Sequence, residues 1–320
     1  MDRPEILHVG KAPDWYLREY DAEFVVHHMP TADPAALPRG LAGRLEVVVS
    51  GGPVRRDFIA ALPRLRLIAN PAAGYERVDV AAAIERGVLV SNAPGANDAC
   101  VADMAFALLL AVARRVLPAD RFVRGGNWPG HGFALVRRAS GRRIGILGLG
   151  RIGSAIARRA AGFDMTVSYH NRNRRPDVGF AYCDSPEALA AASDYLVVAC
   201  PGGPQTRHLV NERVLHALGS DGIVVNIARG TIIDEAALVR ALAERRIAGA
   251  GLDVFENEPE VPEALRSLDT VVLTPHAAGG SFETWKETGE IVRSNIRAFL
   301  RGEALPTPVP EMAGMAARQR

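Results

Sequence analysis

The chain has 320 residues, of which 48% are hydrophobic and 23% charged, and a formal net charge of +2. This length is typical of about two globular domains, and the balanced charge gives no reason to expect a nucleic-acid partner. Cys100, Cys183 and Cys200 show neither metal-ligand spacing nor an even number. We therefore expect no bound metal and a reducing, cytoplasmic environment. The polar residues at the start of the sequence lack the apolar core of a signal peptide.

The first part of the chain alternates short apolar runs with helical segments. Such alternation predicts a parallel sheet covered by helices. The expected strands are residues 6–9, 24–27, 46–50, 65–69 and 88–91, and the expected helices are residues 13–20, 53–61 and 80–86.

The most apolar stretch lies between Met104 and Ala113, inside a helix expected over residues 102–116. It is too short to span a bilayer, so we expect no membrane partner. A helix that is apolar on all sides is buried either in a core or against a second subunit. We favour a subunit interface here, with the core as the alternative. A loop rich in Gly, Trp and Pro follows at residues 125–133.

The second part of the chain repeats the alternation of strands and helices and ends in an amphipathic helix over residues 281–300. The tail from Glu303 contains several prolines, and we expect it to be extended or loose. We therefore predict an α/β protein with two Rossmann-like domains on parallel sheets. The expected strands of this part are residues 144–147, 165–169, 195–198, 223–227, 249–252 and 270–273.

A dinucleotide-binding fingerprint begins the second part. Gly148, Gly150 and Gly153 follow an apolar run and precede a helical stretch over residues 154–161. The first glycine allows a tight turn, the second allows the backbone to approach a pyrophosphate, and the third allows the helix to pack on the strand. The phosphates would then lie at the helix N-terminus. The residues assigned to the cofactor here are Gly148, Leu149, Gly150, Arg151, Ile152 and Gly153.

The loop after the second strand of this part indicates which nicotinamide cofactor binds. No acidic residue occurs between Asp164 and Asp177, where an NAD-binding protein normally has one. A guanidinium pairs with a 2′-phosphate, which a carboxylate would repel. We therefore favour NADPH over NADH, which stays possible, and a solvated basic loop is the alternative interpretation. The candidate residues are His170, Asn171, Arg172 and Arg174, with Arg172 nearest the strand.

Polar residues follow three later strands, at the sheet edge where ligands of α/β proteins bind. Arg229 follows residues 223–227, Asp253 and Glu258 follow residues 249–252, and His276 follows residues 270–273. Taken singly, each has an ordinary structural explanation as a surface ion pair, a turn residue or a structural histidine. Together, in this order after a cofactor fingerprint, they indicate a catalytic set.

This arrangement resembles the D-isomer-specific 2-hydroxyacid dehydrogenases over nearly the whole chain. The arginine-rich loop is similar to that of the NADPH-using glyoxylate/hydroxypyruvate and hydroxyphenylpyruvate reductases of that family. Further matching motifs are Ala73-Gly74-Tyr75, the segment 90–95 and the segment 124–128.

The resemblance implies roles in the reduction of a 2-keto acid to the D-2-hydroxy acid. His276 would donate the proton, and Glu258 would hydrogen-bond its ring and favour the protonated form. Glu256 is an alternative to Glu258, although the family motif places the acid directly before the proline. Arg229 would hold the carboxylate of the small-molecule substrate and polarise its carbonyl.

The resemblance also assigns binding residues. The backbone N–H groups of Ala73 and Gly74 would bind the substrate carboxylate, and Arg229 and His276 would contact the substrate. Asp253 would face the nicotinamide side, and Ala228 is assigned to the cofactor.

The domain organisation implied by the resemblance is discontinuous. A substrate domain of residues 1–99 and 285–320 would contain an inserted nucleotide-binding domain of residues 100–284. The 102–116 helix and the loop around Trp128 would form a homodimer, and closure of the two domains would exclude water from the reaction.

Other functions on the same scaffold stay open. A nucleotide-sensing binding protein, similar to the C-terminal-binding-protein corepressors, is one alternative, and formate or phosphite oxidation is another. Ala72-Ala73 and Glu76 depart from the residues usual in the family, so the substrate could also be a larger aryl 2-keto acid.

Overall fold

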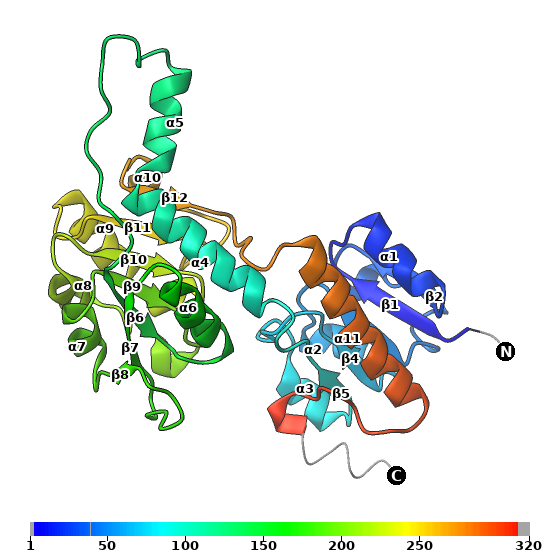
Figure 1. Ribbon diagram of the computed structural model, residues 1–320. Helices are drawn as coiled ribbons and strands as arrows, with labels where there is room; N and C mark the ends of the chain where they lie inside the picture. The colour runs from blue at the N-terminus through cyan, green and yellow to red at the C-terminus, as the bar shows by residue number, and fades with distance from the viewer. Residues whose placement is uncertain (1–2, 39, 313–320) are drawn as a thin grey trace. The chain divides into compact units, whose positions relative to one another are not determined.

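The first of two units is built on a five-stranded parallel sheet in the order β2-β1-β3-β4-β5 (Figure 1). The computed structural model describes residues 3–38 and 40–312. Residues 1–97 and 281–320 form this unit, and residues 98–280 form the second. Its strands and helices are β1 (Glu5–Val9), α1 (Asp14–Asp21), β2 (Val25–Met29), β3 (Val47–Ser50), α2 (Arg56–Ala60), β4 (Leu67–Ala69), α3 (Val80–Glu85), β5 (Leu89–Ser91) and α11 (Phe282–Leu300).

Helices cover both faces of this sheet because successive apolar side chains along its strands point to opposite faces. On one face, Leu7, Val48 and Ile68 pack with residues of α2 and α3. On the other face, Ile6 and Leu67 pack with residues of α1 and α11. The C-terminal helix α11 therefore completes a layer that the N-terminal part of the chain begins.

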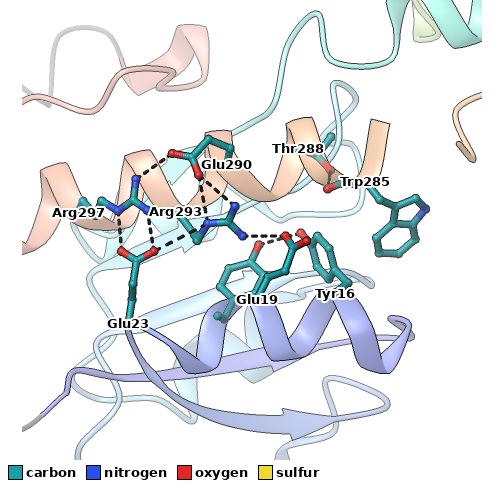
Figure 2. Close-up of polar contacts among 9 residues, drawn as sticks. Tyr16, Glu19, Glu23, Trp285, Thr288, Glu290, Arg293 and Arg297 are labelled. Atoms are coloured by element: carbon teal, nitrogen blue, oxygen red, sulfur yellow. Dashed lines mark hydrogen bonds and ion pairs between the residues drawn. The ribbon is translucent and has the colours of Figure 1, made fainter. Parts of the chain in front are cut away.

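Ion pairs join α11 to α1 along this layer (Figure 2). The guanidinium of Arg293 lies 3.1 Å from Glu19 and 3.0 Å from Glu290, with its side chain only 12% exposed. Arg297 donates two hydrogen bonds of 2.6 Å to the carboxylate of Glu23. The contacts with Glu19 and Glu23 bridge segments that are 274 residues apart in the chain.

The second unit contains a seven-stranded sheet in the order β12-β11-β10-β9-β6-β7-β8, with every strand pair parallel. The strand order reverses between β6 and β9, and ligands of open α/β sheets bind at such a point. Its elements are α4 (Asp98–Ala113), α5 (Val116–Arg124), β6 (Arg143–Leu147), α6 (Arg151–Ala161), β7 (Thr166–His170), β8 (Ala181–Tyr182), α7 (Pro186–Ala191), β9 (Tyr195–Val198), α8 (Glu212–Leu218), β10 (Ile223–Asn226), α9 (Glu235–Ala243), β11 (Gly249–Leu252), α10 (Glu263–Arg266) and β12 (Val271–Leu273).

The apolar helix α4 belongs to the core of its own unit, which corrects our preference for a subunit interface. Leu108 lies over Gly251, and Val112 lies over Gly249, because neither glycine of β11 has a side chain to keep the helix away. Most other apolar residues of α4 are buried in the same core. Within the described residues, no helix is long and apolar enough to cross a membrane.

Several element boundaries differ from those expected. The helix expected over residues 102–116 ends at Ala113, and the separate helix α5 begins at Val116 after Arg115, which has a left-handed backbone with φ 50°. α2 starts only at Arg56 because Val54 pairs with Val78 in an isolated bridge. The two unit boundaries lie at residues 97 and 280, shortly before the expected 99 and 284.

The tail after Glu303 is not loose as far as residue 312. Pro308 forms an antiparallel bridge with Ser91, and the N–H of Val309 donates to Val90. Val309 and Met312 have no exposed surface. The tail therefore lies along the edge strand β5, and residues 313–320 lie outside the described part.

Candidate functional site

The fingerprint loop joins β6 to α6 and has the geometry of a phosphate cradle. Gly148 has φ +104°, and a Cβ there would lie 2.5 Å from the backbone nitrogen of Cys200. A Cβ on Gly153 would lie 2.1 Å from the carbonyl oxygen of Gly148. Around Gly150, by contrast, there is nothing within 4 Å of such a Cβ among the described residues. The open position lies at the N-terminus of α6, where first-turn N–H groups lack helical acceptors, so the loop fits a pyrophosphate.

Cys200, which follows β9 and is half-buried, lies beside this loop. Burial raises the pKa of the Cys200 thiol to about 11, so it stays neutral. A neutral thiol adds no negative charge that would repel a phosphate at the cradle.

Two residues assigned to the cofactor are hydrogen-bonded to each other. The N–H of Leu149 donates to Oδ1 of Asn171 over 2.6 Å, and the side chain of Leu149 is buried. Asn171 therefore holds the fingerprint loop against the end of β7. His170 is fixed similarly, since its Nδ1 lies 2.9 Å from the carbonyl oxygen of Cys183.

The arginines after β7 have different environments. Arg175 pairs with Asp177 and also donates to the carbonyl of Leu149 (3.0 Å) and to Oγ of Ser154 (3.1 Å). Arg172 is exposed and donates to Oε1 of Gln205 over 2.8 Å, and the exposed Arg174 lies over the ring of Tyr182. Asp177 thus neutralises Arg175, which leaves Arg172 and Arg174 as the candidates for a phosphate.

The turn that carries Arg229 is organised by a buried asparagine. Asn226, 1% exposed at the end of β10, accepts from the N–H of Ala228 and donates to the carbonyl of Arg229 over 2.9 Å. A Cβ on Gly202 would lie 2.7 Å from Cγ of Arg229, so glycine is needed there beside the arginine side chain. The sequence pointed to Arg229 and Ala228 but missed Asn226, whose only signal is its place at the end of a buried strand.

Asp253 organises the loop that carries His276. Its side chain has no exposed surface, and its carboxylate accepts from Thr274 Oγ1 (2.5 Å) and from the N–H groups of Ala277 (2.8 Å) and Ala278 (2.9 Å). Its carbonyl accepts from the N–H of His276, which has a left-handed backbone with φ 53°. The structure therefore gives Asp253 a positioning role, and a direct contact with a cofactor stays a prediction.

A histidine–carboxylate pair lies at the end of this loop. Nδ1 of His276 lies 2.7 Å from Oε2 of Glu258, and the N–H of Phe255 donates to Oε1 of the same carboxylate. A carboxylate can only accept, so Nδ1 carries the hydrogen and Nε2 is left as the nitrogen that can exchange a proton. Glu256, the alternative acid, lies instead against His208 and Arg207.

Residues Ala73 and Gly74 lie in the first unit, on the loop after β4. Asn70 donates to the carbonyls of Ala72 and Gly74, each over 2.9 Å, and Asn92 donates to the carbonyl of Ala73 over 2.8 Å. Within the part of the chain that the structure describes, the N–H groups of Ala73 and Gly74 have no protein acceptor. The two asparagines thus bind three carbonyls of this loop. The N–H groups of Ala73 and Gly74 remain as donors that suit an anion.

The described residues contain no group of three or more His, Cys, Asp or Glu side chains that could hold a metal ion.

Comparison with known proteins identifies the family. Residues 106–278 match the family described as D-isomer specific 2-hydroxyacid dehydrogenase, NAD binding domain. The chain belongs to this family. The dehydrogenase is 47% identical over 253 residues to a hydroxyphenylpyruvate reductase of Plectranthus scutellarioides, covering 79% of this chain and 81% of that protein. It is 47% identical over 265 residues to a glyoxylate reductase of Pyrococcus horikoshii, covering 80% and 79%.

The fold of the dehydrogenase matches a solved relative. It is similar to the NADPH-dependent glyoxylate/hydroxypyruvate reductase of Sinorhizobium meliloti, whose crystal structure contains NADP and malonate. The TM-score is 0.90 at 39% identity, with 97% of this chain and 98% of that chain covered. The predicted family and the two parallel-sheet α/β domains are thus confirmed, and the protein is an oxidoreductase.

Proposed function

We propose that the dehydrogenase reduces a small 2-keto acid of the glyoxylate or hydroxypyruvate type to the D-2-hydroxy acid, with NADPH as the reductant. The observation that carries this proposal is the His276–Glu258 pair, 2.7 Å apart, on the sheet edge of the unit that contains the cofactor cradle. The relatives named for reduction of glyoxylate, hydroxypyruvate and hydroxyphenylpyruvate support it.

Different residues of the chain have different roles in this reaction. A bound nicotinamide cofactor supplies a hydride to the carbonyl carbon of the keto acid. His276 donates a proton from Nε2 to the carbonyl oxygen, and Glu258 holds the ring and stabilises the imidazolium before transfer. Arg229 binds the substrate carboxylate and polarises the carbonyl. The N–H groups of Ala73 and Gly74 are proposed as further donors to a substrate carboxylate.

Support for NADPH comes from the charges after β7. Arg172 and Arg174 are exposed. The carboxylate of this loop, Asp177, forms an ion pair with Arg175. A 2′-phosphate would therefore meet two guanidinium groups, and the adenosine ribose of NADH would lack its usual carboxylate partner. The solved S. meliloti relative contains NADP.

We also propose a homodimer, through α5 and the segment that follows it. Both extend away from the sheet of their unit (Figure 1) and expose apolar side chains, among them Val123 (52%), Trp128 (66%) and Leu135 (101%). Exposed apolar side chains gathered on one projecting segment indicate a protein interface. Light scattering on the wild type and on Val123→Asp tests this proposal, since a dimer should become a monomer.

The function is tested by one assay series. Oxidation of NADPH and of NADH is followed with glyoxylate, hydroxypyruvate, phenylpyruvate and pyruvate as substrates. We expect turnover with NADPH and a small 2-keto acid. No turnover with any of the four acids would contradict the reductase function, whereas faster turnover with NADH would contradict only the choice of cofactor.

A further inference from the structure

A second histidine–carboxylate pair, His208 and Glu256, lies in the second unit. Glu256 precedes Glu258 by two residues. Nε2 of His208 lies 3.0 Å from Oε1 of Glu256, and Nη2 of Arg207 donates to the same oxygen over 2.7 Å. The side chain of Glu256 is only 19% exposed. The reaction proposed above makes no use of these three residues, which we call the His208 cluster.

The backbone of His208 is hydrogen-bonded to the loop that carries Arg229. Its N–H donates over 2.9 Å to the carbonyl of Thr231, which follows Arg229 by two residues. Next to it, Val210 and Ile233 form an isolated bridge. His208 also has φ 51°, a left-handed conformation that is uncommon for a residue with a side chain. His208 is thus bonded to the Arg229 loop through its backbone and to the Glu258 loop through its ring.

These two loops are in close contact beside the His208 cluster. A Cβ on Gly230 would lie 1.9 Å from the carbonyl carbon of Phe255, so only glycine fits between the loops. The N–H of Glu256 donates to Oε2 of Glu235 at the start of α9. The contact has no room for adjustment by side-chain rotation, and a shift of one loop must move the other.

We propose that the His208 cluster positions Arg229 relative to Glu258, and through Glu258 the imidazole of His276. Arg229 holds the carboxylate in the proposed reaction, while the His276–Glu258 pair delivers the proton to the neighbouring carbonyl. The distance between the two groups must therefore match the substrate, and a misplacement of about 1 Å costs on the order of 100-fold in rate. This inference rests on the proposed function for its kinetic consequence, but not for its structural one.

The simpler interpretation is a surface ion pair without consequence for the reaction. The side chain of His208 is 36% exposed, and exposed pairs contribute little to stability. Kinetic variants separate the two interpretations, because loss of a surface pair would leave turnover unchanged.

The test compares His208→Ala, Glu256→Ala and the double variant with His208→Gln, whose amide N–H can still donate to Glu256. We expect each alanine variant to lower kcat for glyoxylate reduction roughly 10- to 100-fold without weakening NADPH binding. The double variant should be no worse than either single variant, and His208→Gln should keep most of the rate. His216→Ala, an exposed histidine on α8, is the matched control and should behave as wild type.

A second measurement is independent of turnover. Hydrogen exchange followed by mass spectrometry should show faster exchange over residues 229–233 and 253–258 together in His208→Ala, with α8 unchanged. An inactive wild type would contradict the proposed function and leave this measurement to decide the structural coupling. Wild-type kcat in the alanine variants, multiplied losses in the double variant, or exchange that rises equally throughout the unit would each overturn the inference.

Discussion

Oε2 of Glu258 lies 2.7 Å from Nδ1 of His276, although 18 residues separate the two in the chain. The pair forms because Glu258 follows β11 and His276 follows β12, and parallel neighbouring strands end at the same sheet edge. Asp253 then fixes the His276 loop through two backbone N–H groups.

Replacing His276 by alanine should abolish most turnover, because the proposed proton donor is lost. We expect kcat to fall roughly 10²- to 10⁴-fold, the usual contribution of a general acid. The dissociation constant for NADPH, measured by fluorescence titration, should stay as in the wild type because the cradle lies on another loop. Wild-type kcat in His276→Ala would refute the assignment.

Glu258→Gln should act differently from the removal of the histidine. Its amide keeps an oxygen that accepts from Nδ1 but loses the negative charge that stabilises the imidazolium. We therefore expect a lower kcat for keto acid reduction, with a smaller loss than in His276→Ala because the ring keeps its orientation. A wild-type kcat with NADPH and glyoxylate would mean that Glu258 only orients the ring.

Arg172 and Arg174 should decide the preference between the two cofactors. Hydrogen bonds to charged groups contribute about 1.5–3 kcal/mol, so Arg172→Ala should weaken NADPH binding roughly 10- to 100-fold. NADH lacks the phosphate, and its binding should change little. Calorimetric titration of both cofactors measures the ratio, and equal losses for the two would contradict the 2′-phosphate role. Arg175→Ala is the informative contrast, since Arg175 bonds to the fingerprint loop and should affect both cofactors.

The sequence predicted the sheets better than it predicted the short elements and loops between them. Strands were recognisable because both faces of a parallel sheet are buried, which gives continuous apolar runs such as Tyr195–Val198. β8, of two residues, has no such signal. α5 was missed because it contains Pro118 and buries none of its residues.

The hydrogen bonds that position the candidate site residues depend on contacts that sequence spacing does not encode. Arg229 and His276 were predictable from their places after strands, but the hydrogen bonds of Asn226 and Asp253 depend on the loop paths. The direction of the Glu256 and Glu258 side chains is likewise not given by their spacing. One carboxylate lies against His208 and the other against His276.

Stability should depend on pH through His8 on β1. Burial, with repulsion from His28 as a smaller cause, lowers the pKa of His8 to about 4, and its Nδ1 has no hydrogen-bond partner within the described residues. The unfolded chain binds this proton near its ordinary pKa of about 6.5, so the free energy of unfolding falls as pH drops from about 6.5 to about 4.

The His8→Leu variant should lose this part of the pH dependence. Urea unfolding of the wild type and the variant at several pH values between 7 and 4 measures it. The stability of the wild type relative to the variant should decrease steadily over that window. Parallel curves for the two proteins would show that His8 is not the titrating group.

The Arg293 ion pairs should contribute more to stability than ion pairs on the surface. Arg293 contacts Glu19 and Glu290, lies over the ring of Tyr20, and is 12% exposed (Figure 2). Arg293→Ala should therefore lower the free energy of unfolding by about 2 kcal/mol, because Glu19 on α1 loses its ion-pair partner on α11. Arg301→Ala removes an exposed pair with Glu303 and should cost less than about 1 kcal/mol. Equal effects of the two variants in urea unfolding would mean that the α1–α11 contact depends on its apolar residues alone.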